Sequence, residues 1–167
     1  ELRQKLEQLA ERITKVPAEP FHLPTGSSYQ AGEPPGKVAF LFPGLGAEYP
    51  HMLSDLCVNF PEARECFDRM DASVRAADGR PLSADIYPPT TFAENELETA
   101  AARLGKIQRA NPALMTASGA MFTILDKLEV RPDMMTGHSS GEWVSLPASG
   151  MADVDRFVSG MSGLNDV

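Results

Sequence analysis

A serine flanked by glycines carries the strongest chemical signal in this 167-residue chain. Residues 137–141 read Gly-His-Ser-Ser-Gly, between the short apolar run 134–136 and a helix-compatible stretch. Gly-x-Ser-x-Gly between a strand and a helix is typical of a nucleophile elbow, which displays the serine hydroxyl on a sharp turn. The pattern therefore predicts Ser139 as a nucleophile in a strained backbone, with Gly137 and Gly141 letting strand and helix approach. The alternative is a glycine-rich turn without chemistry, because the pattern also arises by chance.

The helix expected from Ser140 onwards would aim its first amides at the hydroxyl of Ser139. Backbone N–H groups and the positive end of the helix dipole both favour a developing oxyanion at that point. His138 precedes the serine, and neighbours at a sharp turn point apart. A structural or pocket-wall role is therefore expected for His138 in preference to that of a general base.

The elements that must position this turn begin with a second apolar strand. Residues 37–43 are continuously apolar after Lys37 and break at once into the loop 44–46. Such a run predicts a strand covered on both faces in a parallel sheet. Strand, helices, strand and helix then follow one another, which predicts an α/β fold with a parallel sheet flanked by helices.

Three helices are expected between the two strands. Apolar periodicity predicts one from about Pro61 and another over residues 94–104. Asn111 and Pro112 resemble an N-cap followed by proline at the first helical position, opening a central buried helix that ends near Leu128. In the helix after Ser139, proline 147 removes a backbone hydrogen bond and should produce a kink.

The first 36 residues have a different character. Leucine, isoleucine and valine recur at helical spacing up to Val16, which predicts an amphipathic helix that ends before Pro17. Packing on its own domain is favoured over a coiled coil, because two heptads are too few. The stretch 17–36 is rich in Pro, Gly and Ser, as linkers are. We therefore expect a linker region over residues 1–36 and a folded domain over residues 37–167.

Composition excludes several classes of partner. The net charge of −8 offers no basic stripe for nucleic acid or for an anionic membrane. Cys57 and Cys66 are too few for a disulfide framework and lack the spacing of a zinc site, so no metal site is predicted and a reducing, cytoplasmic location is expected. No apolar run approaches the length of a membrane span.

Three segments together resemble one family. The loop 42–49 is similar to the Pro-Gly-Gln-Gly loop of malonyl- and acyl-carrier-protein transacylases, and residues 137–142 resemble their nucleophile motif. Residues 111–114 resemble their Gln-Pro-Ala segment, and residues 1–36 resemble the linker between ketosynthase and acyltransferase domains of polyketide and polyunsaturated-fatty-acid synthases. The resemblance implies an α/β-hydrolase-like acyltransferase core, incomplete here because the ferredoxin-like subdomain and the C-terminal part are absent.

The resemblance also implies a ping-pong acyl transfer. Ser139 would take an acyl group from acyl-CoA and pass it to the phosphopantetheine thiol of an acyl carrier protein, with no bound cofactor. The N–H groups of Leu45 and Ser140 would form the oxyanion hole. His138 and Asn111 would line the substrate site, and the motif glycines are Gly44, Gly46, Gly137 and Gly141. A neighbouring ketosynthase domain is a further expected partner.

Several departures from the family leave alternatives open. Leu45 stands where glutamine is usual, and neither His22 nor His51 matches the general base, which lies well downstream of the serine in the family. The arginine that binds a malonyl carboxylate in many members would fall near Leu164, which favours a non-carboxylated acyl group. A serine hydrolase, such as an esterase or thioesterase, and a non-catalytic docking module of a synthase are the alternative functions.

Overall fold

The computed structural model describes residues 2–32, 36–74, 79–90 and 95–152. The chain divides into two compact units, residues 1–36 and 37–167. The boundary falls at the end of the Pro- and Gly-rich stretch. That the first unit links two domains remains a prediction.

The first unit is a helix packed on a small hairpin. Helix α1 (Leu2–Lys15) ends before Pro17 as predicted, and β1 (Phe21–His22) pairs antiparallel with β2 (Ser28–Tyr29). The guanidinium of Arg12 lies 4.9 Å from the centre of the Phe21 ring, and the Tyr29 hydroxyl donates a hydrogen bond to the carbonyl of Pro17. The sequence did not predict this hairpin, because its strands have only two residues each.

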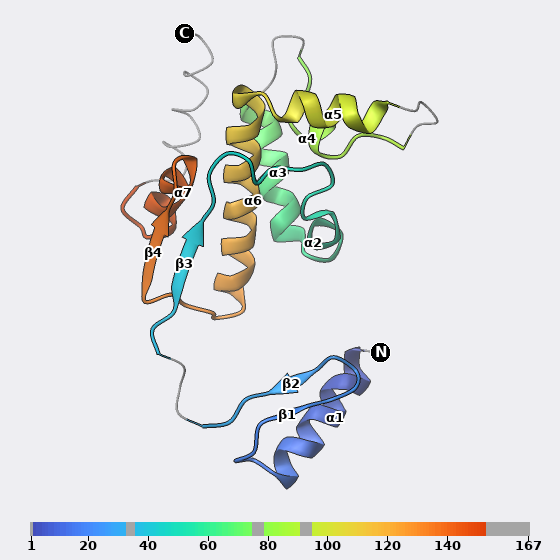
Figure 1. Cartoon of the computed structure of the whole chain (residues 1–167), viewed down its shortest axis with the longest axis vertical. Helices are drawn as coiled ribbons and strands as arrows, with labels where there is room; N and C mark the ends of the chain where they lie inside the picture. Colours follow the sequence, from blue (N-terminus) through green and yellow to red (C-terminus); the bar gives the residue numbers. More distant parts are fainter. Residues whose placement is uncertain (1, 33–35, 75–78, 91–94, 153–167) are drawn as a thin grey trace. The chain divides into compact units, whose positions relative to one another are not determined.

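The second unit contains a short parallel sheet. Strand β3 (Ala39–Phe42) pairs with β4 (Met134–Gly137), and the register places Phe42 beside Gly137 (Figure 1). Both strands lie where they were predicted. The prediction that both faces are covered is wrong for the described residues: Leu41 is 74% exposed and Met134 is 50% exposed, whereas Phe42 is buried. The apolar side chains of one face pack against helices, and those of the other face are exposed among the described residues.

Helices cover the buried face of this sheet and fill the crossover between its strands. In chain order, those of the crossover are α2 (Ser54–Asn59), α3 (Pro61–Ser73), α4 (Ser83–Ile86), α5 (Glu96–Leu104) and α6 (Ile107–Lys127), and α7 (Ser140–Ala148) follows β4. The first of them and α4 were not predicted, and they have only six and four residues. Figure 1 shows α6 between the sheet on one side and α3 on the other.

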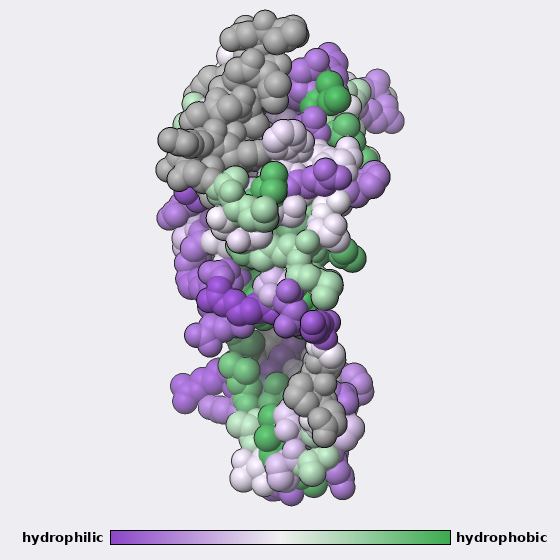
Figure 2. Space-filling view, turned by 90° about the vertical axis from the view of Figure 1, so that its left-hand side faces the viewer, coloured by the Kyte–Doolittle hydropathy of each residue, from purple (hydrophilic) through white to green (hydrophobic). Residues whose placement is uncertain are grey.

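The apolar core has two parts on opposite sides of α6. The larger part joins α3 to α6 and is formed by buried residues that include Phe67, Met70, Leu82, Ile86 and Leu104. The smaller part lies under the sheet, where Phe42, Met115 and Val144 pack together with half-buried side chains. Thus α6 is the central helix that its apolar circumference predicted. Polar side chains cover much of the face shown in Figure 2, with smaller apolar patches between them.

The start of α6 corrects one prediction. The helix begins at Ile107, so Asn111 is not its N-cap and Pro112 lies inside it. The N–H groups of Arg109 and Ala110 both donate to the carbonyl of Lys106 at 2.8 Å and form the first turn upstream of the proline.

A buried ion cluster explains this extra turn. Asp85 is 2% exposed, and its two carboxylate oxygens accept hydrogen bonds of 2.8 Å from Arg103 and Arg109. Arg109 also donates to the carbonyl of Pro81 at 2.6 Å. Tertiary contacts from α4 and α5 therefore hold the first residues of α6 in the helix, against the local capping signal.

Helix α7 runs from Ser140 to Ala148 and contains Pro147 at its penultimate position. The kink expected there stays a prediction. Cys57 and Cys66 are unpaired and half-buried. In the described ranges, no helix is both long enough and apolar enough to cross a bilayer.

Candidate active site

The turn between β4 and α7 holds Ser139 in an unusual backbone conformation. Its φ is 53° and its ψ is −120°, and its side chain is exposed. The N–H of Gly141 donates to the carbonyl of His138 at 2.9 Å, and that of Glu142 donates to the carbonyl of Ser139 at 3.0 Å. A non-glycine residue at positive φ is strained and persists only where its surroundings enforce it.

The two flanking glycines are required by close packing. A β-carbon on Gly137 would lie 2.1 Å from the carbonyl carbon of Gly141, and one on Gly141 would lie 2.2 Å from the carbonyl oxygen of Phe42. Neither position can hold a side chain unless backbone moves. The end of the strand, the serine and the first turn of the helix therefore pack together only with glycine at both positions.

The loop after β3 reaches the same point. A β-carbon on Gly44 would lie 3.0 Å from the β-carbon of Ser139 and 2.7 Å from the carbonyl oxygen of His138. The N–H of His138 donates to the carbonyl of Phe42 at 3.0 Å, which continues the pairing of the two strands. The loop after β3 and the turn after β4, which are far apart in the sequence, thus meet at Ser139. Leu45 is the residue that follows Gly44 in this loop.

A carboxylate fixes this loop beyond Leu45. The N–H of Gly46 donates a 2.8 Å hydrogen bond to a carboxylate oxygen of Glu48, and Gly46 has a φ of 100°. This contact was not predicted from the sequence. The available signal was a carboxylate two residues after a glycine, a spacing at which acidic side chains often bond to nearby backbone.

The other predicted site residues lie in three environments. His138 is exposed, and its Nδ1 atom lies 3.0 Å from the position that a Gly44 β-carbon would take. Ser140 is 8% exposed, and its hydroxyl is buried without a hydrogen-bond partner among the described residues. The side-chain oxygen of Asn111, on α6, is also buried and unpartnered there. Leu164 lies outside the described residues.

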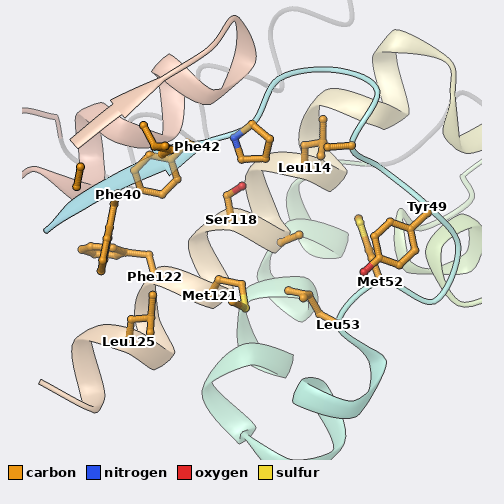
Figure 3. Close-up of a pocket in the computed structure, with 15 residues that line it drawn as sticks. Phe40, Phe42, Tyr49, Met52, Leu53, Leu114, Ser118, Met121, Phe122 and Leu125 are labelled. Carbon is orange, nitrogen blue, oxygen red and sulfur yellow. The ribbon is translucent and has the colours of Figure 1, made fainter. Parts of the chain in front are cut away.

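An apolar pocket borders the same loop. Its volume is about 380 Å³, and it lies between β3, α6 and the segment 47–53. Figure 3 shows Phe40 and Phe42 on one side, Ser118, Met121 and Phe122 on α6, and Tyr49, Met52 and Leu53 opposite. Ser139 is not among the described residues that line this pocket.

The turn and loop together provide the parts of an acyl-transfer site. An exposed hydroxyl stands at the N-terminus of a nine-residue helix, and a glycine loop packs against it. Such a corner can present a nucleophile to a carbonyl group and backbone amides to the oxyanion that forms. No group of three or more His, Cys, Asp or Glu side chains suited to a metal ion occurs in the described part of the chain.

The known proteins with related sequences include acyl carrier protein transacylases and fatty-acid or polyketide synthases. No family model matches the chain. A polyunsaturated fatty acid synthase polypeptide from a Thraustochytrium species is 32% identical over 127 residues, which cover 73% of this chain and 4% of that protein. The malonyl CoA-acyl carrier protein transacylase of Escherichia coli K12 is 32% identical over 116 residues, which cover 69% of this chain and 33% of that protein.

Solved structures agree with the sequence matches. A malonyl-transacylase, solved in complex with the acyl carrier protein of a type II polyketide synthase, superposes with a TM-score of 0.62 at 26% identity. The match covers 76% of this chain and 37% of that chain. The resemblance drawn from the three motifs is confirmed, as is the prediction of an incomplete α/β acyltransferase core. The chain spans about a third or less of the length of the relatives described here.

Proposed function

This chain is a homologue of the acyl carrier protein transacylases and of the synthases that contain such acyltransferases, and we propose that it provides the nucleophile of an acyl transfer to an acyl carrier protein. The observation that carries the proposal is the contact between the Gly44 loop and Ser139, where a β-carbon added to Gly44 would lie only 3.0 Å from that of Ser139. This contact supports an oxyanion hole in which the N–H groups of Leu45 and Ser140 lie at the same corner as the hydroxyl.

The proposed reaction has two half-reactions. The Ser139 oxygen attacks the carbonyl carbon of an acyl-CoA thioester, and a tetrahedral oxyanion forms. The N–H groups of Leu45 and Ser140 stabilise this oxyanion. The bond between carbon and sulfur then breaks, and CoA leaves as the free thiol, with the proton that the serine lost, to give a seryl ester. The phosphopantetheine thiol of the carrier protein then attacks the ester and releases the serine.

The remaining site residues have supporting roles in the proposal. The exposed side chain of His138 and the unpartnered oxygen of Asn111 are available to line the acyl-thioester site. We propose a non-carboxylated acyl group as the one transferred. The reason is that position 164, where many family members have the arginine that binds a malonyl carboxylate, is a leucine in this sequence. A cytoplasmic location and a ketosynthase domain as neighbour belong to the same proposal.

Mass spectrometry of the acyl-enzyme tests this proposal. The protein is incubated with acetyl, malonyl and longer acyl thioesters, and the adduct is mapped by peptide analysis. We expect an adduct on Ser139 that is absent from Ser139→Ala and is discharged by a carrier protein bearing phosphopantetheine. Release to water at the same rate without carrier protein would indicate a hydrolase. No adduct with any donor would indicate a non-catalytic docking module.

A further inference from the structure

We propose that Glu48 is a positioning residue for the oxyanion hole, holding the loop that presents the Leu45 amide to Ser139. This inference rests on the proposed acyl transfer and adds a residue to it. Its starting point is the 2.8 Å hydrogen bond from the Gly46 N–H to the Glu48 carboxylate.

The loop is fixed on both sides of Leu45. On one side, Gly44 is buried and packs against His138 and Ser139, so its backbone cannot move towards them. On the other side, the N–H of Gly46 is held by a charged acceptor. The peptide group that carries the Leu45 N–H lies between these two points, and its direction is therefore determined by both.

Gly46 makes no backbone–backbone hydrogen bond among the described residues. A β-carbon at this position would meet no atom within 4 Å, and the φ of 100° is open to glycine and rarely to other residues. The side chain of Leu45 is 44% exposed. Without the carboxylate, the backbone at Gly46 would be free to rotate and would carry the neighbouring peptide with it.

A carboxylate suits this task because it accepts a strong hydrogen bond. A hydrogen bond to an ionised acceptor is roughly twice as strong as a neutral one, so it can hold a solvent-accessible glycine loop. Glu48 accepts from the Gly46 N–H, and the Leu45 N–H donates to no backbone carbonyl among the described residues. In the proposal, the Leu45 N–H is therefore the donor to the oxyanion. A small displacement of a donor is costly, because a misplacement of about 1 Å can slow a reaction about 100-fold.

The test compares initial rates of Ser139 acylation in four proteins by intact-mass spectrometry with one saturating acyl thioester. They are the wild-type chain, Glu48→Ala, Glu48→Gln and the control Glu65→Ala, which removes the same charge from an exposed position on α3. We expect Glu48→Ala to acylate about tenfold more slowly, below the roughly 10²–10³-fold effect of deleting an oxyanion donor. Glu48→Gln keeps an acceptor and should stay within about threefold of wild type, as should Glu65→Ala.

A second measurement separates positioning from folding. Amide hydrogen exchange should show the Gly46 N–H protected in wild type and Glu48→Gln and exchanging faster in Glu48→Ala, with the amides of α6 unchanged in all four proteins. Equal acylation rates in wild type and Glu48→Ala would overturn the role of Glu48 while leaving the acyl transfer intact. A wild-type chain that forms no adduct would overturn both proposals. A rate loss in Glu48→Gln as large as in Glu48→Ala would also overturn the positioning role.

Discussion

Replacing the proposed nucleophile with glycine should make the protein more stable. Ser139 has a φ of 53° and a ψ of −120°, a conformation that glycine adopts freely and other residues do not. Strain of this kind lowers the stability of the folded protein by about 1–3 kcal/mol, and glycine relieves it. Glycine also makes the unfolded chain more flexible, which lowers stability by about 0.4–1 kcal/mol. We therefore expect Ser139→Gly to be more stable than Ser139→Ala by about 1 kcal/mol, since alanine keeps the strain.

Urea unfolding followed by the fluorescence of the single tryptophan measures this difference. That residue, Trp143, lies on α7, one turn after the proposed nucleophile, so its signal reports on the unit that contains the site. Ser139→Ala should lie within about 0.5 kcal/mol of wild type, because it removes only an exposed hydroxyl. Unchanged m-values would show that the variants differ in stability and not in the extent of unfolding.

A matched control is available at the other end of the sheet. Glu129 follows α6 with a φ of 59°, and the N–H of Val130 donates back to the carbonyl of Leu125, as at helix ends closed by a left-handed residue. Glu129→Gly should exceed Glu129→Ala in stability by about 1 kcal/mol as well, with acylation unaffected. If Ser139→Gly is no more stable than Ser139→Ala while the control pair behaves as expected, the backbone at Ser139 is not strained and the reasoning fails.

Four further outcomes are expected. Gly141→Ala places a methyl group against the Phe42 carbonyl, so it should destabilise by about 3 kcal/mol or more and abolish acylation; an unchanged urea midpoint would contradict the packing. Asp85→Ala leaves two guanidinium groups without their carboxylate and should cost about 3–5 kcal/mol in the same assay, and a loss below about 1 kcal/mol would show that the cluster is not needed. Ser140→Ala removes a buried hydroxyl that has no described partner but keeps the amide, so stability should stay equal or rise by up to about 1 kcal/mol, and acylation should persist; a loss of activity would place the hydroxyl itself in the reaction. Residues 1–167 alone should turn over slowly, because an unassisted serine hydroxyl is a weak nucleophile, and steady-state kinetics with acyl-CoA and carrier protein would reveal any brisk turnover.

The turn around Ser139 could be predicted from sequence because its close contacts admit only glycine, and glycines at this spacing are visible in the chain. Gly137 meets the backbone of Gly141, four residues further on, and Gly141 meets the carbonyl of Phe42 on the paired strand. The partner loop was predicted from its likeness to a family, and its approach to the serine follows from the pairing of β3 with β4.

Features whose distant contacts leave no mark on the local residue types could not be predicted in this way. The first turn of α6 is held by Asp85, which lies 24 residues before Arg109, and no local signal at Asn111 and Pro112 reports that ion pair. The exposed face of β3 was mispredicted for a related reason. A run of apolar residues says that a strand is suited to burial on both faces, but not which side chains find a partner.

The contacts that bring Ser139 and the Gly44 loop together differ from those that stabilise the rest of the unit. Neighbouring strands lie about 4.8 Å apart, so pairing of Phe42 with Gly137 starts the two loops side by side before any loop residue is chosen. The glycines then close the remaining gap, while the buried packing of α3 on α6 and the Asp85 cluster provide stability elsewhere in the unit. Substitutions in that core should therefore lower the free energy of unfolding without moving the serine relative to its loop. A shift of one residue in the β3–β4 register should have the opposite effect, because it would carry Gly44 away from Ser139 while leaving the α3–α6 core in place.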